Sequence, residues 1–310
     1  MRMLHICQWL AAVLAMAGMG VACTPAPVSQ ESPQIPRKWT DVAYASLSPA
    51  QQLDIYLPAS GIGPFPVIIS IHGGAFKMGD KADRQVQPML QGLTRGYAVV
   101  SLNYRLSGEA LYPAQIHDVK AAIRFLKAHA TTYSLDTGRV AVWGGSAGGH
   151  LSALAATSGG VDTLEDFALG NSGVSSRVQA VVDWFGPIDF STMDSHFRTS
   201  GKGKPDHDAP DSPESLLLGR PVQAAPDLVR AASPATYISA DDPPFLIQHG
   251  TEDPLVPVQQ SQEFADALTG VLGDKVTLML LEGAGHGGPQ FETPANLELV
   301  FNFLDLHLNR

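Results

Sequence analysis

The chain alternates short apolar runs with amphipathic segments over most of its length. Residues 41–44 and 52–57 alternate apolar and polar positions with a period of two, which is typical of half-exposed strands at an antiparallel sheet edge. Residues 67–71 and 97–102 are instead almost continuously apolar and β-branched, as buried parallel strands are. Apolar residues recur every three or four positions in residues 113–129, which predicts a helix.

The same alternation continues to the end of the chain. We expect further strands at residues 140–143, 178–184, 245–248 and 276–280, and further helices at residues 147–156, 258–272 and 294–306. This rhythm predicts an α/β fold with a mostly parallel central sheet and helices on both faces. Residues 187–243 are polar, rich in proline and weakly periodic, so we interpret them as an insertion near the carboxyl edge of the sheet, within one domain of residues 39–310.

The first forty residues differ from the rest and indicate export. Residues 6–22 form an apolar run that follows Arg2 and ends in Gly-Val-Ala, which predicts a signal peptide over residues 1–22. A permanent membrane helix is the alternative, although the run is slightly short for the about 18 to 20 apolar residues that a span needs. Residues 23–38 carry four prolines among serine and glutamine, and we expect a tether there. The mature protein is therefore expected in the periplasm or outside the cell.

Cys23 directly follows Gly-Val-Ala and resembles the lipid-attachment cysteine of bacterial lipoproteins. Gly20 departs from that pattern, because lipoproteins usually have Leu, Val or Ile there. Membrane attachment through a lipidated Cys23 and plain cleavage before it both stay open. The only other cysteine is Cys7, so the folded domain is expected to work without thiol chemistry.

Composition and charge narrow the range of partners. A chain with 45% apolar and 16% charged residues is globular rather than disordered or fibrous. It has 20 Lys and Arg against 30 Asp and Glu, a formal net charge of -10, which leaves no basic surface for a nucleic-acid backbone. No His, Cys, Asp or Glu cluster has the spacing of a metal site, so we predict neither a metal nor a cofactor.

A candidate nucleophile lies between a predicted strand and a predicted helix, in the sequence Trp-Gly-Gly-Ser-Ala-Gly-Gly at residues 143–149. A serine in such a sharp turn presents its hydroxyl outward, and small neighbours leave room for the strained backbone. We therefore expect Ser146 to be a nucleophile. A glycine-rich turn with an incidental serine is the alternative.

A serine nucleophile needs a base, and the base needs an acid that orients it. Asp253 and His286 each follow a later predicted strand, so both are expected at the sheet edge that carries Ser146. The order Ser, Asp, His is that of α/β-hydrolases. Glu252 is the alternative acid, and His249 is the alternative base.

A glycine-rich loop, Ile-His-Gly-Gly-Ala-Phe at residues 71–76, also follows a predicted strand. Acyl transfer forms an oxyanion, and each backbone N–H group aimed at it stabilises the transition state by about 3 kcal/mol. Glycine lets the backbone approach closely. We predict that Gly73, Gly74 and Ala147 donate to the oxyanion, and that His72 orients the loop by hydrogen bonding.

Together with Asn-Tyr-Arg-Leu-Ser at residues 103–107, these motifs resemble those of the hormone-sensitive-lipase-related α/β-hydrolases. Over residues 40–306 the chain is most similar to the bacterial bifunctional feruloyl and acetyl-xylan esterase group. The resemblance implies a carboxylic ester hydrolase that acts on acetyl or hydroxycinnamoyl esters of plant polysaccharide, with Ser146 attacking the carbonyl and His286 as base. Ala75 stands where lipases of the wider group have a third glycine, so the preference for alcohol bulk is expected to differ.

Two other functions are alternatives to ester hydrolysis. A serine peptidase of the prolyl-oligopeptidase type shares the order of the triad, but such enzymes usually carry a large N-terminal propeller, for which this chain has no room. A non-catalytic binding module on the same fold is the other alternative.

The insertion also bears on acyl length. It carries Asp206, Asp208 and Asp211, so we expect no broad apolar lid of the kind a lipase needs. Its large apolar residues are expected to pack onto the sheet instead of lining a long acyl tunnel, which favours short acyl groups.

Overall fold

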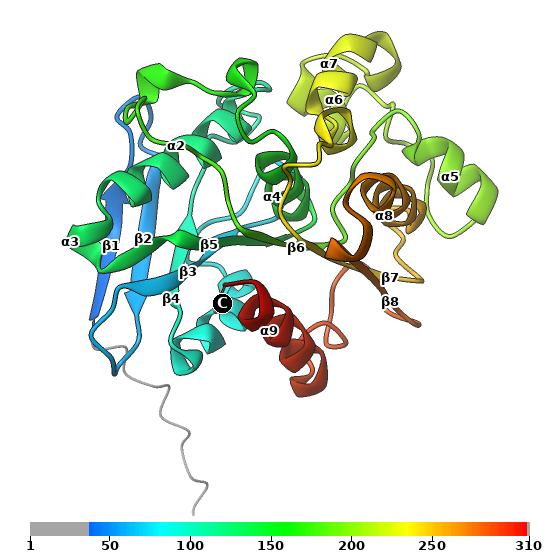
Figure 1. The fold of residues 1–310 in the computed structure, drawn as a ribbon. Coiled ribbons are helices and arrows are strands. Elements are labelled where there is room, and N and C mark those ends of the chain that lie inside the picture. Colours follow the sequence, from blue (N-terminus) through cyan, green and yellow to red (C-terminus); the bar gives the residue numbers. More distant parts are fainter. Residues whose placement is uncertain (1–36, 309–310) are drawn as a thin grey trace, which may run out of the picture. The chain divides into compact units, whose positions relative to one another are not determined.

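The computed structural model describes residues 37–308 (Figure 1). The predicted signal peptide, Cys23 and the tether up to residue 36 lie outside the described residues. The first strand begins at Arg37, two residues before the domain start that we predicted.

Within these residues, eight strands form one sheet in the order β1-β2-β4-β3-β5-β6-β7-β8. The β1–β2 and β2–β4 pairs are antiparallel and every other pair is parallel, as expected for an antiparallel edge on a parallel sheet. The strands are β1 (Arg37–Ala43), β2 (Gln52–Leu57), β3 (Phe65–Ile71), β4 (Ala98–Leu102), β5 (Leu135–Gly145), β6 (Ala180–Trp184), β7 (Phe245–Gly250) and β8 (Val276–Leu281).

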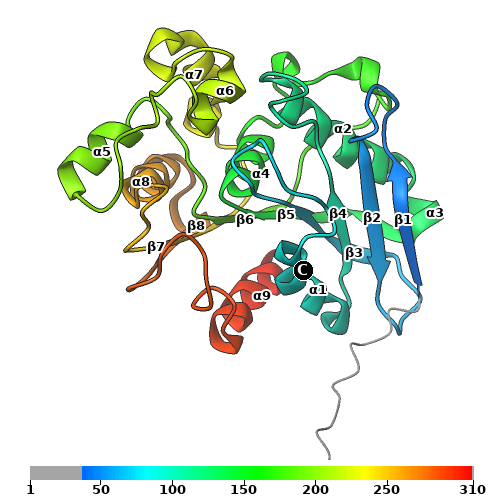
Figure 2. The same cartoon turned by 180° about the vertical axis from the view of Figure 1, so that it is seen from behind.

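Helices cover both faces of the sheet (Figures 1 and 2). One face carries α2 (Ala114–Ala128), α4 (Ala147–Thr157) and α8 (Gln259–Leu272), and the other carries α1 (Gln87–Leu90) and α9 (Pro294–Leu308). Shorter elements join them: α3 (Ala130–Tyr133), η1 (Arg84–Val86), η2 (Gln91–Arg95), η3 (Asp162–Leu164), η4 (Phe167–Leu169) and η7 (Gly273–Lys275). Among the described residues, no helix is both long enough and apolar enough to span a bilayer.

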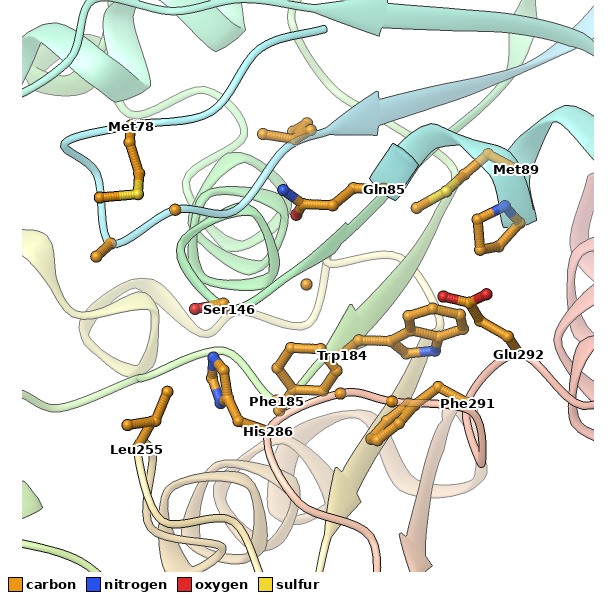
Figure 3. Close-up of a pocket in the computed structure, with 17 residues that line it drawn as sticks. Met78, Gln85, Met89, Ser146, Trp184, Phe185, Leu255, His286, Phe291 and Glu292 are labelled. Atoms are coloured by element: carbon orange, nitrogen blue, oxygen red, sulfur yellow. The ribbon is translucent and has the colours of Figure 1, made fainter. Parts of the chain in front are cut away.

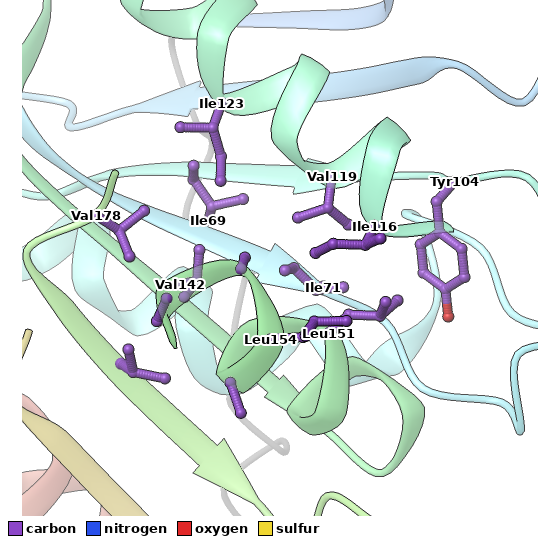
Figure 4. Close-up of a cluster of buried hydrophobic side chains, with 14 of the residues drawn as sticks. Ile69, Ile71, Tyr104, Ile116, Val119, Ile123, Val142, Leu151, Leu154 and Val178 are labelled. Carbon is purple, nitrogen blue, oxygen red and sulfur yellow. The ribbon is translucent and has the colours of Figure 1, made fainter. Parts of the chain in front are cut away.

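The central strands supply side chains to two cores, one on each face. Successive side chains of a strand point to opposite faces, so Ile69 and Ile71 of β3 pack against α2 and α4 (Figure 4), whereas Ile68 packs with the α9 side. All seven residues of β3 are buried, which explains why all of them except Ser70 are apolar. The outer strand β1 has no fully buried residue, in keeping with its alternating sequence.

The insertion at residues 187–243 is partly helical. It contains α5 (Met193–Ser200), α6 (Pro213–Leu218) and α7 (Pro226–Ala232), with η5 (Val222–Ala224) and η6 (Pro234–Tyr237). In Figure 1 these helices lie on the side of the sheet that carries α4 and α8. Phe190, Met193 and Phe197 are buried, as expected for residues that pack the insertion onto the domain.

Candidate active site

Ser146 occupies the turn between β5 and α4 in a strained conformation. Its φ of 57° and ψ of -125° lie where residues other than glycine are rarely found. The Ser146 N–H donates to the carbonyl of Trp184 at 2.9 Å, which ties the turn to β6. A Cβ atom on Gly148 would lie 2.0 Å from the carbonyl oxygen of Ile71, so this position requires glycine. The small residues around Ser146 are thus needed to make the turn.

His286 is held by Asp253. Its Nδ1 lies 2.7 Å from Asp253 Oδ2, and because a carboxylate only accepts, the Nδ1–H group donates. The other oxygen of Asp253 accepts the N–H groups of Leu255 and Val256 at 2.8 and 2.9 Å. Figure 3 shows the Ser146 hydroxyl and the His286 ring facing each other at the same end of a cavity. This arrangement leaves Nε2 of His286 as the nitrogen available to Ser146.

Asp253 is charged although it is buried. Burial alone would raise the pKa of Asp253, but hydrogen bonds from His249 and His286 outweigh it and hold that pKa well below the usual range. A carboxylate that stays ionised can stabilise a positive charge on His286.

The two alternatives from the sequence occupy other places. His249 is fully buried and lines neither of the cavities beside Ser146. Its Nδ1 lies 2.7 Å from Ser261 Oγ, and its Nε2 lies 3.2 Å from Asp253 Oδ2, so His249 helps to hold the Asp253 carboxylate in place. Glu252 is exposed and pairs with Lys202 at 2.8 Å. The structure therefore brings Ser146, Asp253 and His286 together and leaves His249 and Glu252 outside the cavities.

The glycine-rich loop differs from our prediction at Gly73. Its N–H donates to Gln85 Oε1 at 2.8 Å and is therefore engaged within the protein. The N–H groups of Gly74, Ala75 and Ala147 have no hydrogen-bond partner within residues 37–308, and all three residues line cavities at Ser146. The available donors are therefore one residue further along the loop than predicted.

Two side chains, those of His72 and Gln85, hold this loop in place. His72 Nδ1 lies 2.8 Å from the carbonyl of Gly73, and the His72 ring stacks on Tyr104 with 4.4 Å between centroids. Burial lowers the pKa of His72, so the ring is neutral and serves the orienting role that we expected. Gln85 in η1 is the second support, and the sequence analysis missed it because a single glutamine outside any motif gives no signal.

Two cavities meet at Ser146. The first, here the apolar cavity, has a volume of about 400 Å³ and extends from Ser146 toward Met89 and Phe291 (Figure 3). It is lined by Ile71, Gly74, Ala75, Met78, Gln85, Pro88, Met89, Gly145, Ser146, Trp184, Phe185, Leu255, His286, Gly287, Gly288, Phe291 and Glu292.

The second, here the acidic cavity, has a volume of about 330 Å³ and is formed largely by the insertion. It is lined by Ala75, Phe76, Ser146, Ala147, Pro187, Asp206, His207, Ala209, Asp211, Ser212, Pro213, Glu214, Leu255, Val256 and His286. The two cavities share Ala75, Ser146, Leu255 and His286, so a molecule bound at Ser146 can extend into both. In the part of the chain that the structure describes, no group of three or more His, Cys, Asp or Glu side chains could hold a metal ion.

A mostly parallel sheet whose carboxyl edge carries a serine turn and an Asp–His pair defines the α/β-hydrolase class. The chain belongs to the BD-FAE family, whose model matches residues 53–268.

Named relatives agree with this assignment. The chain is 36% identical over 278 residues to the probable carboxylic ester hydrolase LipM of Mycobacterium tuberculosis, an alignment that covers 87% of this chain and 61% of LipM. It is 32% identical to the esterase LipC of the same organism, over 77% of this chain and 57% of LipC. The chain thus spans less than two thirds of the length of these two relatives.

Solved structures show the same similarity. A truncated form of a carbohydrate esterase from gut microbiota is 35% identical with a TM-score of 0.79, covering 88% of this chain and 97% of that one. A bifunctional GH43-CE protein of Bacteroides eggerthii is 36% identical with a TM-score of 0.79, over 87% of this chain and 35% of that protein. The thermophilic esterase Est2 of Thermogutta terrifontis is 26% identical with a TM-score of 0.69, over 88% and 94%.

Proposed function

We propose that the protein is a serine carboxylic-ester hydrolase that acts on short acyl or hydroxycinnamoyl esters of carbohydrates. The observation that carries this proposal is the meeting of three features at one end of two cavities: the Ser146 turn, the hydrogen-bonded pair of His286 and Asp253, and backbone N–H groups that have no partner among the described residues. The names of the relatives, which include esterases and a carbohydrate esterase, support the same reaction class.

The mechanism has two halves. The Ser146 hydroxyl attacks the ester carbonyl while Nε2 of His286 takes its proton, and Asp253 stabilises the resulting imidazolium. The N–H groups of Gly74, Ala75 and Ala147 donate to the oxyanion that forms. His286 returns the proton to the departing alcohol and an acyl-serine remains. Water then attacks the acyl-serine with His286 again as base, which releases the acid and restores Ser146.

Export is part of the proposal. It rests on the apolar run at residues 6–22, with Cys23 either lipidated or left as the first residue after cleavage. Polysaccharide esters are met outside the cytoplasm, so the location suits the substrate class. Labelling of cells with a radioactive fatty acid, comparing the wild type with Cys23→Ala, distinguishes the anchored from the free form.

A substrate panel tests the reaction. Purified protein and the Ser146→Ala variant are assayed on p-nitrophenyl acetate, acetylated xylan, methyl ferulate and an aminoacyl p-nitroanilide. We expect turnover of the esters by the wild type alone. Faster release from the anilide would identify a peptidase, and no turnover of any substrate would favour a binding module.

A further inference from the structure

The acidic cavity lies beside the reacting serine, yet the chemistry proposed above uses none of its carboxyl groups. Asp206, Asp211 and Glu214 of the insertion line it, and its lining contains no Lys or Arg. His207 does not supply a free partner, because its Nδ1 lies 3.0 Å from Asp194 Oδ1 and its Nε2 lies 3.1 Å from the carbonyl of Leu255. The cavity is therefore negatively charged and rich in hydrogen-bond acceptors.

Glu214 is the unusual member of this lining. Its side chain belongs to the first turn of α6 and the residue is only 5% exposed, yet Oε2 has no hydrogen-bond partner within the described part of the chain. A buried polar group without a hydrogen-bond partner is energetically unfavourable. Burial raises the pKa of Glu214 above its ordinary value. An unsatisfied group of this kind at the edge of a binding cavity indicates a partner supplied by a ligand.

We propose that the acidic cavity binds the alcohol part of the ester and that Glu214 hydrogen-bonds to a hydroxyl group of that alcohol. Glu214 is then a specificity-determining residue, and this inference rests on the proposed ester hydrolysis. The acyl group of the same ester then lies in the apolar cavity.

The assignment of the two sides follows from their linings. The lining of the apolar cavity includes the large apolar side chains of Met89, Trp184 and Phe291, which can bury an acyl group but offer it few hydrogen bonds. Hydroxyl groups of a polyol can instead donate to Glu214, Asp206 and Asp211, whereas an alcohol that carries a carboxylate would be repelled by them. His286 lines both cavities, so it can protonate an alcohol that leaves into the acidic one.

Space for a larger alcohol continues beyond this cavity. Asp206, His207 and Leu255 also line an adjoining open groove with Lys202 and Lys204. An alcohol with several sugar units can therefore extend outward while the unit next to the ester remains near Glu214.

The test compares two acetate esters that share the acyl group. Glyceryl monoacetate and propyl acetate have the same three-carbon alcohol skeleton, but only the first carries free hydroxyl groups. The wild type, Glu214→Gln and Glu214→Leu are assayed with both esters in competition, and the ratio of kcat/KM values is measured. Glu298→Gln is the matched control, because Glu298 lies on α9, pairs with Arg95 and lines neither cavity.

We expect the wild type to prefer the glyceryl ester and Glu214→Leu to lose about 3- to 10-fold of that preference, as the loss of one hydrogen bond predicts. Glu214→Gln, which keeps a polar amide, should lose less, and Glu298→Gln should keep the wild-type ratio. Glu214→Leu is expected to fold because Oε2, one of the two oxygens that it removes, has no hydrogen-bond partner among the described residues.

The ratio separates specificity from general damage, because a folding defect lowers both activities equally. An unchanged ratio in Glu214→Leu, or a wild type without preference for the glyceryl ester, overturns the role of Glu214 and leaves ester hydrolysis standing. Propyl acetate and propyl butyrate differ only in the acyl group. If Glu214→Leu changes the ratio of kcat/KM values between these two esters instead, the acidic cavity would be assigned to the acyl side. Failure of the wild type to hydrolyse any ester overturns the proposed function as well.

Discussion

Asp183 makes the stability of the domain depend on pH in an unusual direction. It lies on β6 without contact to solvent, its Oδ1 accepts the N–H of Gly186 at 3.0 Å, and its Oδ2 has no partner among the described residues. Burial raises the pKa of Asp183 from 3.8 to about 6, although the bond from Gly186 and the nearby His249 oppose the change.

The sign of the effect follows from proton binding. Between about pH 4 and pH 6 the folded state holds a proton on Asp183 that the unfolded state has lost, so stability falls as the pH rises through this window. The difference of about two pKa units corresponds to about 3 kcal/mol. This contribution is present in full below the unfolded pKa and is lost above the folded one.

The Asp183→Asn variant isolates this contribution, because an amide does not titrate and can still accept from Gly186. The free energy of unfolding in urea is measured for both proteins from about pH 4 to about pH 7.5. The contributions of the other carboxyl groups cancel in the difference between the two free energies of unfolding. As the pH rises, this difference should change by about 3 kcal/mol in favour of the variant. Asp227→Asn, which removes a 93% exposed carboxylate, controls for the loss of one charge. A difference that stays constant across the range would refute the reasoning.

Four further predictions concern catalysis. Ser146→Ala should fold but lose about four to six orders of magnitude in kcat on p-nitrophenyl acetate; retention of more than a few per cent would show that another group is the nucleophile. Gln85→Leu leaves the N–H of Gly73 without its acceptor and should lower kcat by about 5- to 100-fold with KM little changed. Gln85→Glu restores an acceptor and should recover part of the rate. His286→Asn should abolish kcat/KM while His249→Asn keeps a measurable value, and the reverse order would make His249 the base. In a series of p-nitrophenyl esters, kcat/KM should be highest from acetyl to butyryl and decline by decanoyl; a maximum at ten carbons or more, with activation at an emulsion interface, would place the enzyme among the lipases.

The parts of the site that could be predicted are those that follow local rules. Ser146 lies in a turn that only small neighbours permit, and Asp253 and His286 follow strands whose apolar pattern places them at one sheet edge. The contact between Gln85 and Gly73 joins residues 12 positions apart and has no local pattern. The helices α5 to α7 were not predicted either, because segments of six to eight residues are too short to show a helical period.

A buried aromatic side chain joins the insertion to α4 and to the glycine-rich loop. The ring of Phe190 in the insertion stacks on the ring of His150 in α4 with 5.1 Å between centroids, and it lies edge-on to the ring of Phe76 in the loop with 6.1 Å between centroids. Burial lowers the pKa of His150 to about 4, so the ring is neutral at physiological pH and its Nδ1 pairs with the carbonyl of Pro187 at 2.7 Å.

The packing of Phe190 against His150 and Phe76, here called the anchor, separates two parts of the chain with different roles. Since this contact fixes the base of the insertion against α4, which begins directly after Ser146, we expect substitutions further out, at the positions that line the acidic cavity, to alter that cavity without moving Ser146. Substitutions at Phe190 itself are expected to disturb α4 and the glycine-rich loop together, because Phe190 packs against His150 of the helix and Phe76 of the loop. On the proposed function, we therefore expect substitutions within the insertion to change substrate choice while the geometry of Ser146, Asp253 and His286 at the sheet edge is kept.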